Sequence, residues 1–178
     1  MTVKAKGAIA AGHPETARAA AIILEEGGNA FDAVIGGVMA ACIAEPVLAS
    51  LGGGGFCLAS PPDGSAVVYD FFTQTPKRRP DDLDFFPIIA DFGTAQQEFH
   101  IGMGSIATPG VVAGLFALHR DRGHMPLQRI AEPAIRLART GVKMNATQAY
   151  IFQIVKAIYL SNDTSASFFG SRKNPGQP

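Results

Sequence analysis

The sequence has 178 residues, and 15 Lys and Arg balance 15 Asp and Glu, so the formal net charge is zero. A domain takes roughly 150 residues, and this length therefore predicts a single domain. The charge balance argues against nucleic acid and against membrane as main partners, because both select a basic face. Only 17% of the residues are charged and 47% are hydrophobic, which excludes disorder over most of the chain.

Cysteine and histidine usage argues against a disulfide framework and against a metal site. The two cysteines, Cys42 and Cys57, are expected to be small buried side chains, and the four histidines form no Cys/His cluster. No signal-peptide core is visible, and the longest apolar stretch, around 33–44, is too short to span a bilayer. The sequence as given therefore predicts a cytoplasmic protein, or a periplasmic or secreted one if a leader was removed.

Two helices are expected first along the chain. Residues 14–26 form an amphipathic pattern that begins with a first-turn proline and ends at a glycine pair. Asn29 can cap a second helix over 30–44, which is apolar nearly all round and should be the most buried element. Because each mid-helix glycine costs roughly 1 kcal/mol relative to alanine, we expect a neighbour at Gly36 and Gly37 that leaves no room for a Cβ.

A hairpin and a long loop are expected next. Two apolar runs at 56–59 and 66–72 flank a Pro-Pro-Asp-Gly turn, a pattern typical of paired strands. Residues 73–99 show no clear pattern and are predicted to be an irregular loop, either functional or mobile.

Three further helices complete the predicted order. The first follows a Thr-Pro start at 108–109 and runs to about 120, the second covers 127–140, and the third covers about 146–160. The tail at 161–178 is turn-rich and is expected to be irregular. Helices, a hairpin, a loop and more helices predict an α/β or α+β layered protein.

Two glycine-rich segments suggest nucleotide binding, but their surroundings argue against it. The four glycines at 52–55 are followed by Phe-Cys and a strand, whereas a phosphate-binding loop needs Gly-Lys-Ser/Thr and a helix. The Gly-x-Gly-x-x-Ala run at 102–107 lies too far before the next helix, and no acidic residue follows at a strand end.

The histidines and a basic run each allow a functional and a structural interpretation. The four histidines could act as general bases, but none accompanies a Ser or Cys in a nucleophile-elbow pattern, so we expect exposed or capping roles: His13, His100, His119 and His124. The basic run Lys77-Arg78-Arg79 is either a solvated loop or a site that attracts an acidic substrate.

Several short segments together match one known family in order and spacing. They are Gly-His-Pro at 12–14, Gly-Gly-Asn-Ala-Phe-Asp-Ala at 27–33, Glu-Pro at 45–46 with Ser-Leu-Gly-Gly-Gly-Gly-Phe at 50–56, Thr-Pro-Gly at 108–110 with Gly114, and Pro-Ala at 133–134 with Leu-Ala at 137–138 and Gly141. Over nearly the whole chain, this pattern resembles the amino-terminal part of the large subunit of the γ-glutamyltransferase family.

That resemblance implies an α+β fold, the four-layer αββα sandwich of N-terminal-nucleophile hydrolases. Residues 1–178 would then be a single incomplete domain, the N-terminal portion of the fold. The family's precursor cleaves itself, and the threonine that begins the small subunit attacks a γ-glutamyl amide, with its own α-amine as the base. No Thr-Thr-His-type segment occurs here. We therefore expect no catalytic residue, no cofactor and no metal in this chain, a C-terminal small subunit as partner, and no activity from the chain alone.

One departure from the family pattern affects the expected substrate. The family usually has Asp-x-Arg-Glu-x-Ala-Pro after the second strand, whereas residues 70–76 read Asp-Phe-Phe-Thr-Gln-Thr-Pro, so Phe72 replaces the arginine that grips the donor α-carboxylate. A guanidinium makes two parallel bonds to a carboxylate and a phenyl ring makes none. This favours a γ-glutamyltransferase-like amidohydrolase, or a relative similar to cephalosporin/glutaryl-type acylases, with a less charged acyl group, unless Arg78 or Arg79 restores the charge. The other hypothesis is a non-catalytic structural portion.

Overall fold

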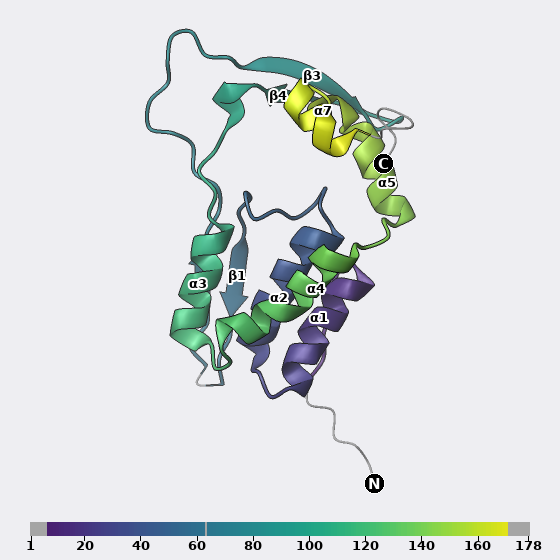
Figure 1. Ribbon diagram of the computed structural model, residues 1–178. Coiled ribbons are helices and arrows are strands. Elements are labelled where there is room, and N and C mark those ends of the chain that lie inside the picture. Colours follow the sequence, from purple (N-terminus) through teal and green to yellow (C-terminus); the bar gives the residue numbers. More distant parts are fainter. Residues whose placement is uncertain (1–6, 63, 171–178) are drawn as a thin grey trace. The chain divides into compact units, whose positions relative to one another are not determined.

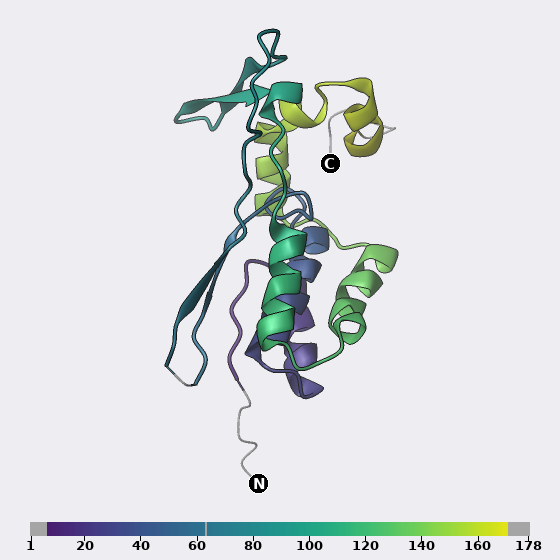
Figure 2. The same ribbon diagram turned by 90° about the vertical axis from the view of Figure 1, so that its left-hand side faces the viewer.

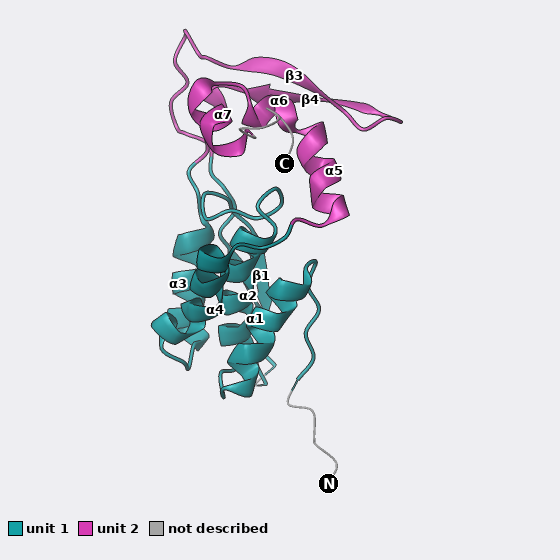
Figure 3. Ribbon diagram, turned by 45° about the vertical axis from the view of Figure 1, so that its right-hand side comes forward, with its two compact units in different colours: residues 1–74, 108–143 teal, residues 75–107, 144–178 magenta. Residues whose placement is uncertain are grey.

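The computed structural model describes residues 7–62 and 64–170 (Figure 1). They fall into two compact units (Figure 3), one made of 1–74 with 108–143 and the other of 75–107 with 144–178. That the two units together form one incomplete domain, residues 1–178, stays a prediction.

The first unit combines a helical layer with one hairpin. Its elements are α1 (Pro14–Glu25), α2 (Ala30–Ala44), β1 (Phe56–Ala59), β2 (Val67–Asp70), α3 (Val111–Arg122) and α4 (Leu127–Thr140). Strands β1 and β2 are antiparallel, with Phe56 opposite Asp70 and Ala59 opposite Val67. Helix α2 packs against α1, α3 and α4, and the hairpin lies on one side of α3 with α4 on the other (Figure 2).

Helix α2 is the centre of this unit's core. Among the helices that the structure describes it has the most buried residues, as its apolar sequence predicted. The largest buried cluster joins α2 to the hairpin, α3 and α4, through Ile35, Ala59, Val111, Leu115, Leu118 and Ile130. Because the apolar residues of α2 point in all directions, helices and strands can pack around it on several sides.

The glycine pair inside α2 is only half explained by close packing. A Cβ on Gly36 would lie 3.0 Å from Ile23 Cγ1 and 3.2 Å from the carbonyl oxygen of Ile130, so the expectation is correct there. A Cβ on Gly37 would lie 3.5 Å from the Cβ of Ala20, an ordinary contact distance, so the expectation is wrong there. Gly37 instead faces an apolar hollow of about 380 Å³ between α1, α2 and residues 8–11.

Leucine at each of these two positions should separate the two environments. We expect Gly36→Leu to lower the free energy of unfolding by roughly 1–3 kcal/mol more than Gly37→Leu, because the added Cβ would lie 3.2 Å from a backbone carbonyl oxygen at Gly36 and 3.8 Å from one at Gly37. Urea unfolding of the chain followed by circular dichroism measures both. Equal losses for the two variants would show that the α2–α4 contact at Gly36 is not tight.

Helix α3 begins later than the sequence suggested. The helix begins at Val111 with Gly110 as its N-cap, so the predicted threonine cap is not used; the backbone of Thr108 instead pairs with that of Gln74 through two hydrogen bonds of 2.8 and 3.1 Å. The first N–H groups of the helix, from Gly110 and Val111, donate instead to the carbonyl oxygen of Gly53 at 3.0 and 3.1 Å. A distant loop thus satisfies the donors that a local side chain was expected to cap.

The second unit contains a hairpin that the sequence interpretation missed. The elements of this unit are β3 (Phe86–Asp91), β4 (Gln96–Ile101), the short 3₁₀ helix η1 (Met103–Ser105), α5 (Ala146–Ile154), α6 (Lys156–Tyr159) and α7 (Asp163–Phe169). Strands β3 and β4 form the hairpin. The expectation of an irregular loop over 73–99 is therefore wrong for the strands, which pair antiparallel with Asp91 opposite Gln96. Their turn depends on Gly93, which has a φ of 83° and donates its N–H to Asp91 Oδ1 at 2.7 Å.

The C-terminal predictions also need correction. The helix expected over 146–160 is divided at Val155 into α5 and α6, and α7 occupies part of the tail expected to be irregular. The side chain of Asn162 caps α7 by accepting a hydrogen bond from Ser165 N at 2.9 Å. The rings of Phe152, Tyr159 and Phe169 pack together, so tertiary contact favours helix where local composition does not. Residues 171–178 lie outside the described residues.

Candidate functional site

The segment after β2, which carries Phe72, is held by hydrogen bonds on both sides. Phe71 exchanges two backbone hydrogen bonds with Gly55, at 3.1 and 3.3 Å. The N–H of Phe72 donates to Asp70 Oδ1 at 3.0 Å, and Gln74 pairs with Thr108. Residues 71–74 therefore have a fixed backbone, and the side chain at 72 projects from a defined position.

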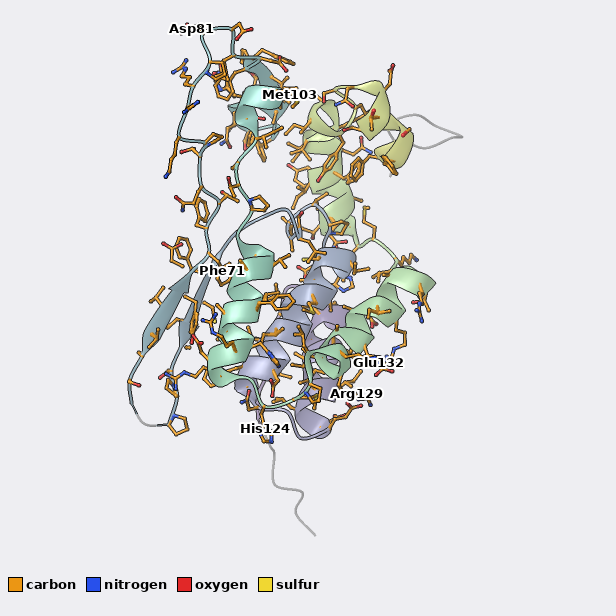
Figure 4. The ribbon with its side chains drawn as sticks, turned by 60° about the vertical axis from the view of Figure 1, so that its left-hand side comes forward. Phe71, Asp81, Met103, His124, Arg129 and Glu132 are labelled. Atoms are coloured by element: carbon orange, nitrogen blue, oxygen red, sulfur yellow. The ribbon has the colours of Figure 1, made fainter. Side chains whose placement is uncertain are left out.

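Close approach of backbones explains the glycines around this segment. A Cβ on Gly54 would overlap Thr73 N, and one on Gly110 would overlap the carbonyl oxygen of Phe71. The half-buried ring of Phe71, labelled in Figure 4, lies directly over Gly114 of α3, where a Cβ would overlap it as well. Gly54, from the run that suggested a phosphate site in the sequence, thus acts with Gly110 and Gly114 to let three backbone segments pack tightly around Phe71.

The ring of Phe72 is 52% exposed and stacks on Phe56. Their centroids are 5.4 Å apart and their planes differ by 13°. Neither ring offers a hydrogen-bond donor to a carboxylate, so this position cannot replace a guanidinium. Phe56 ends the Ser-Leu-Gly-Gly-Gly-Gly-Phe segment at 50–56, but the sequence alone assigned it no role at this site. Its place opposite Asp70 in the hairpin is the signal that could have found it.

The two arginines considered as substitutes belong to the second unit, whereas Phe72 belongs to the first. Arg78 and Arg79 are exposed and line a hollow of about 770 Å³, together with Asp82, Asp84 and other residues of 75–107. Within the described part of the chain, neither arginine forms an ion pair.

The histidines have structural contacts. His13 is buried and caps α1, accepting a hydrogen bond from Glu15 N at Nδ1 (3.1 Å), which confirms the capping role. His100 and His124 are exposed, and the ring of His100 stacks on Phe85 with centroids 4.4 Å apart. Nε2 of His119 lies 2.8 Å from the carbonyl oxygen of Met125, so this half-buried ring ties α3 to the following loop.

The run at 27–33 is a structural joint around the buried carboxylate of Asp32. That carboxylate accepts hydrogen bonds from the N–H groups of Asn29 (2.9 Å), His124 (3.0 Å) and Met125 (3.2 Å). The Asn29 side chain accepts from the first turn of α2 and donates to the carbonyl of Arg122 at 2.8 Å. The start of α2 is thereby joined to the loop between α3 and α4.

The two cysteines are half-buried free thiols, less buried than the sequence suggested. Burial raises the pKa of the Cys42 and Cys57 thiols, which favours the protonated form over the nucleophilic thiolate. Over residues 7–62 and 64–170, no three His, Cys, Asp or Glu side chains gather to hold a metal ion. None of the helices in that same part is both long and apolar enough to cross a bilayer.

Known proteins resemble this chain over most of its length. It is 36% identical over 149 residues to the glutathione hydrolase proenzyme of Escherichia coli, covering 80% of this chain and 24% of that protein. It is 29% identical over 176 residues to the acylase ACY 1 proenzyme of Pseudomonas sp. strain V22, covering 96% and 29%. The crystal structure of Helicobacter pylori gamma-glutamyltranspeptidase aligns with a TM-score of 0.78 at 24% identity, covering 97% and 48%.

These comparisons show how much of its relatives the chain covers and to which family it belongs. It spans about a quarter of the length of these two curated relatives and about half of the solved chain. The structural likeness confirms the expected α+β fold of an N-terminal portion of an N-terminal-nucleophile hydrolase. The family model described as Gamma-glutamyltranspeptidase matches residues 16–177. The chain therefore belongs to the gamma-glutamyltranspeptidase family.

Proposed function

We propose that this chain forms part of an amide hydrolase or acyltransferase whose acyl donor lacks a free α-carboxylate. The observation that carries the proposal is Phe72, which stands on a fixed backbone where the family pattern has its carboxylate-binding arginine. A carboxylate placed against a phenyl ring loses hydration without gaining a partner, a penalty of several kcal/mol. Similarity to an acylase supports a donor other than γ-glutamyl, whereas the similarity to a glutathione hydrolase is equally consistent with a γ-glutamyl donor.

In this proposal the nucleophile is an N-terminal threonine on a C-terminal small subunit. Its hydroxyl attacks the amide carbonyl, and its own α-amine takes the hydroxyl proton. The C–N bond then breaks, the amine leaves with that proton, and an ester joins the acyl group to the threonine. Water or an amine attacks the ester and releases the acid or a new amide. The present chain contributes part of the wall that receives the acyl group.

The proposal is tested with the full self-processed protein beside the isolated 178-residue chain. We expect the full protein to release p-nitroaniline from butyryl p-nitroanilide and the isolated chain to release none, because no acyl-enzyme can form without the nucleophile. A full-length variant with the nucleophilic threonine replaced by alanine controls for contaminating host enzymes. Turnover by the rigorously purified chain would refute the role of the small subunit. A correctly processed full protein that cleaves no amide would favour the non-catalytic hypothesis.

A further inference from the structure

Gly110 and Gly114 leave the space in which Phe71 lies against the start of α3. Gly110 precedes the helix, and Gly114 lies about one helical turn further along. A Cβ on Gly110 would lie 2.7 Å from the carbonyl carbon of Phe71, and a Cβ on Gly114 would lie 2.5 Å from its Cβ. Main-chain and Cβ atoms cannot rotate away from a contact as the end of a side chain can. A Cβ at either position therefore requires a backbone shift, of α3 or of the segment at 71–74.

The segment at 71–74 is the part that we expect to move. Three members of the largest buried cluster belong to α3: Val111, Leu115 and Leu118. A shift of the helix would open this core, whereas the segment contributes to it only the partly buried Phe71. Carbon atoms in contact lie about 3.5–4.0 Å apart. A Cβ on Gly114 would therefore displace the Cβ of Phe71 by about 1 Å.

Such a displacement reaches Phe72 through the main chain. Phe71 and Phe72 share a peptide bond, and the N–H of Phe72 is held by Asp70 Oδ1 at 3.0 Å. A Cβ on Gly54 would lie 2.8 Å from the carbonyl carbon of Phe72, so the loop before β1 lies directly against this residue. A side chain that selects a ligand must stand within about 0.5 Å of its productive position, and a misplacement of about 1 Å can lower a rate about a hundredfold. The expected shift is therefore large enough to change selection at position 72.

We infer that Gly114 is a positioning residue for acyl-donor selection, acting through Phe71 on position 72. What it contributes is the absence of a side chain, which lets the segment at 71–74 lie against α3. The family pattern places donor selection at position 72 alone, and the contact with Phe71 adds a residue of α3 to it. This inference rests on the proposed function, because it concerns the residue to which that function assigns donor selection.

The test is a double-mutant cycle in the full self-processed protein, with γ-glutamyl and butyryl p-nitroanilides as donors. We expect Phe72→Arg alone to raise the γ-glutamyl-to-butyryl ratio of kcat/KM about tenfold. Combined with Gly114→Ala, the gain should fall to about threefold or less, because a displaced guanidinium loses its paired geometry on the carboxylate. Gly123→Ala is the matched control, since a Cβ there would overlap His119 at the other end of α3. It should lower the melting temperature and leave the tenfold gain intact.

The outcomes separate this inference from the proposed function. If Phe72→Arg gives its gain and Gly114→Ala leaves that gain intact, the inference is wrong and the proposed function stands. Equal reductions by Gly114→Ala and Gly123→Ala would trace the effect to a general loss of stability, and the inference would again be wrong. If Phe72→Arg gives no gain, the selective role of position 72 fails and the inference fails with it, whereas wild-type turnover of butyryl p-nitroanilide still tests the proposed amide chemistry.

A second variant tests the same contact from the other side if Gly114→Ala does not fold. Phe71→Leu keeps the Cβ and removes the ring that lies over Gly114, which loosens the segment at 71–74 without adding an atom to α3. We expect it to reduce the γ-glutamyl gain of Phe72→Arg at least about threefold. An undiminished gain in this variant would overturn the inference.

Discussion

Phe72→Arg is expected to shift the kcat/KM of the full self-processed protein toward γ-glutamyl donors tenfold or more. The new guanidinium would supply two parallel hydrogen bonds to the donor α-carboxylate, where the wild-type ring supplies none. A charge-assisted hydrogen bond contributes roughly 1–3 kcal/mol, which corresponds to this change in rate. The backbone bonds at Asp70, Gly55 and Thr108 do not involve the ring, so the variant should keep its fold.

The measurement compares γ-glutamyl, glutaryl and butyryl p-nitroanilides on both proteins. Glutaryl keeps a carboxylate and lacks the α-amine, and butyryl lacks both, so the series separates the two charges. Phe116→Arg adds the same side chain at a phenylalanine of equal exposure (53%) on α3 and should not change the preference. If the wild type already favours γ-glutamyl over butyryl a hundredfold, another cation such as Arg78 or Arg79 recognises the carboxylate. Phe72 would then not be the specificity switch.

Asp32→Ala should produce the largest loss of stability among single substitutions in the first unit. The change leaves the N–H groups of Asn29, His124 and Met125 without their shared acceptor. Hydrogen bonds to a charged group contribute roughly 1.5–3 kcal/mol each, so we expect a loss of at least about 3 kcal/mol. Urea unfolding gives the value. Asp81→Ala, at an exposed loop aspartate, should change stability by no more than about 0.5 kcal/mol. A similar small effect at both positions would contradict the role of Asp32.

The sequence predicted the helical part of the first unit well because the signals there are local. Asn29 and Gly141 mark helix ends through their own backbone and side-chain preferences, and the apolar run over 30–44 requires burial wherever it lies. Helix α4 accordingly has the bounds that the sequence predicted, Leu127–Thr140.

What the sequence could not predict depends on distant partners. Thr108 has the residue type of a helix N-cap, but in the folded chain its backbone pairs with that of Gln74 and α3 begins later, at Val111. The β3–β4 pairing arises between a strand containing Pro87 and a strand rich in glutamine, neither of which alternates clearly. For the site, the family pattern identified position 72, whereas the stacking of Phe56 on it required the strand register.

The neighbouring residues Phe71 and Phe72 differ in position: one packs against the core and the other is exposed. The ring of Phe71 lies over Gly114 and contacts the core, whereas Phe72 projects outward from the same short segment. Every hydrogen bond that holds the segment uses main-chain atoms or the side chains of other residues. Position 72 can therefore change its chemistry during evolution while its neighbour preserves the architecture. If position 72 contacts the acyl group as proposed, single substitutions there change acyl specificity without an intermediate that fails to fold.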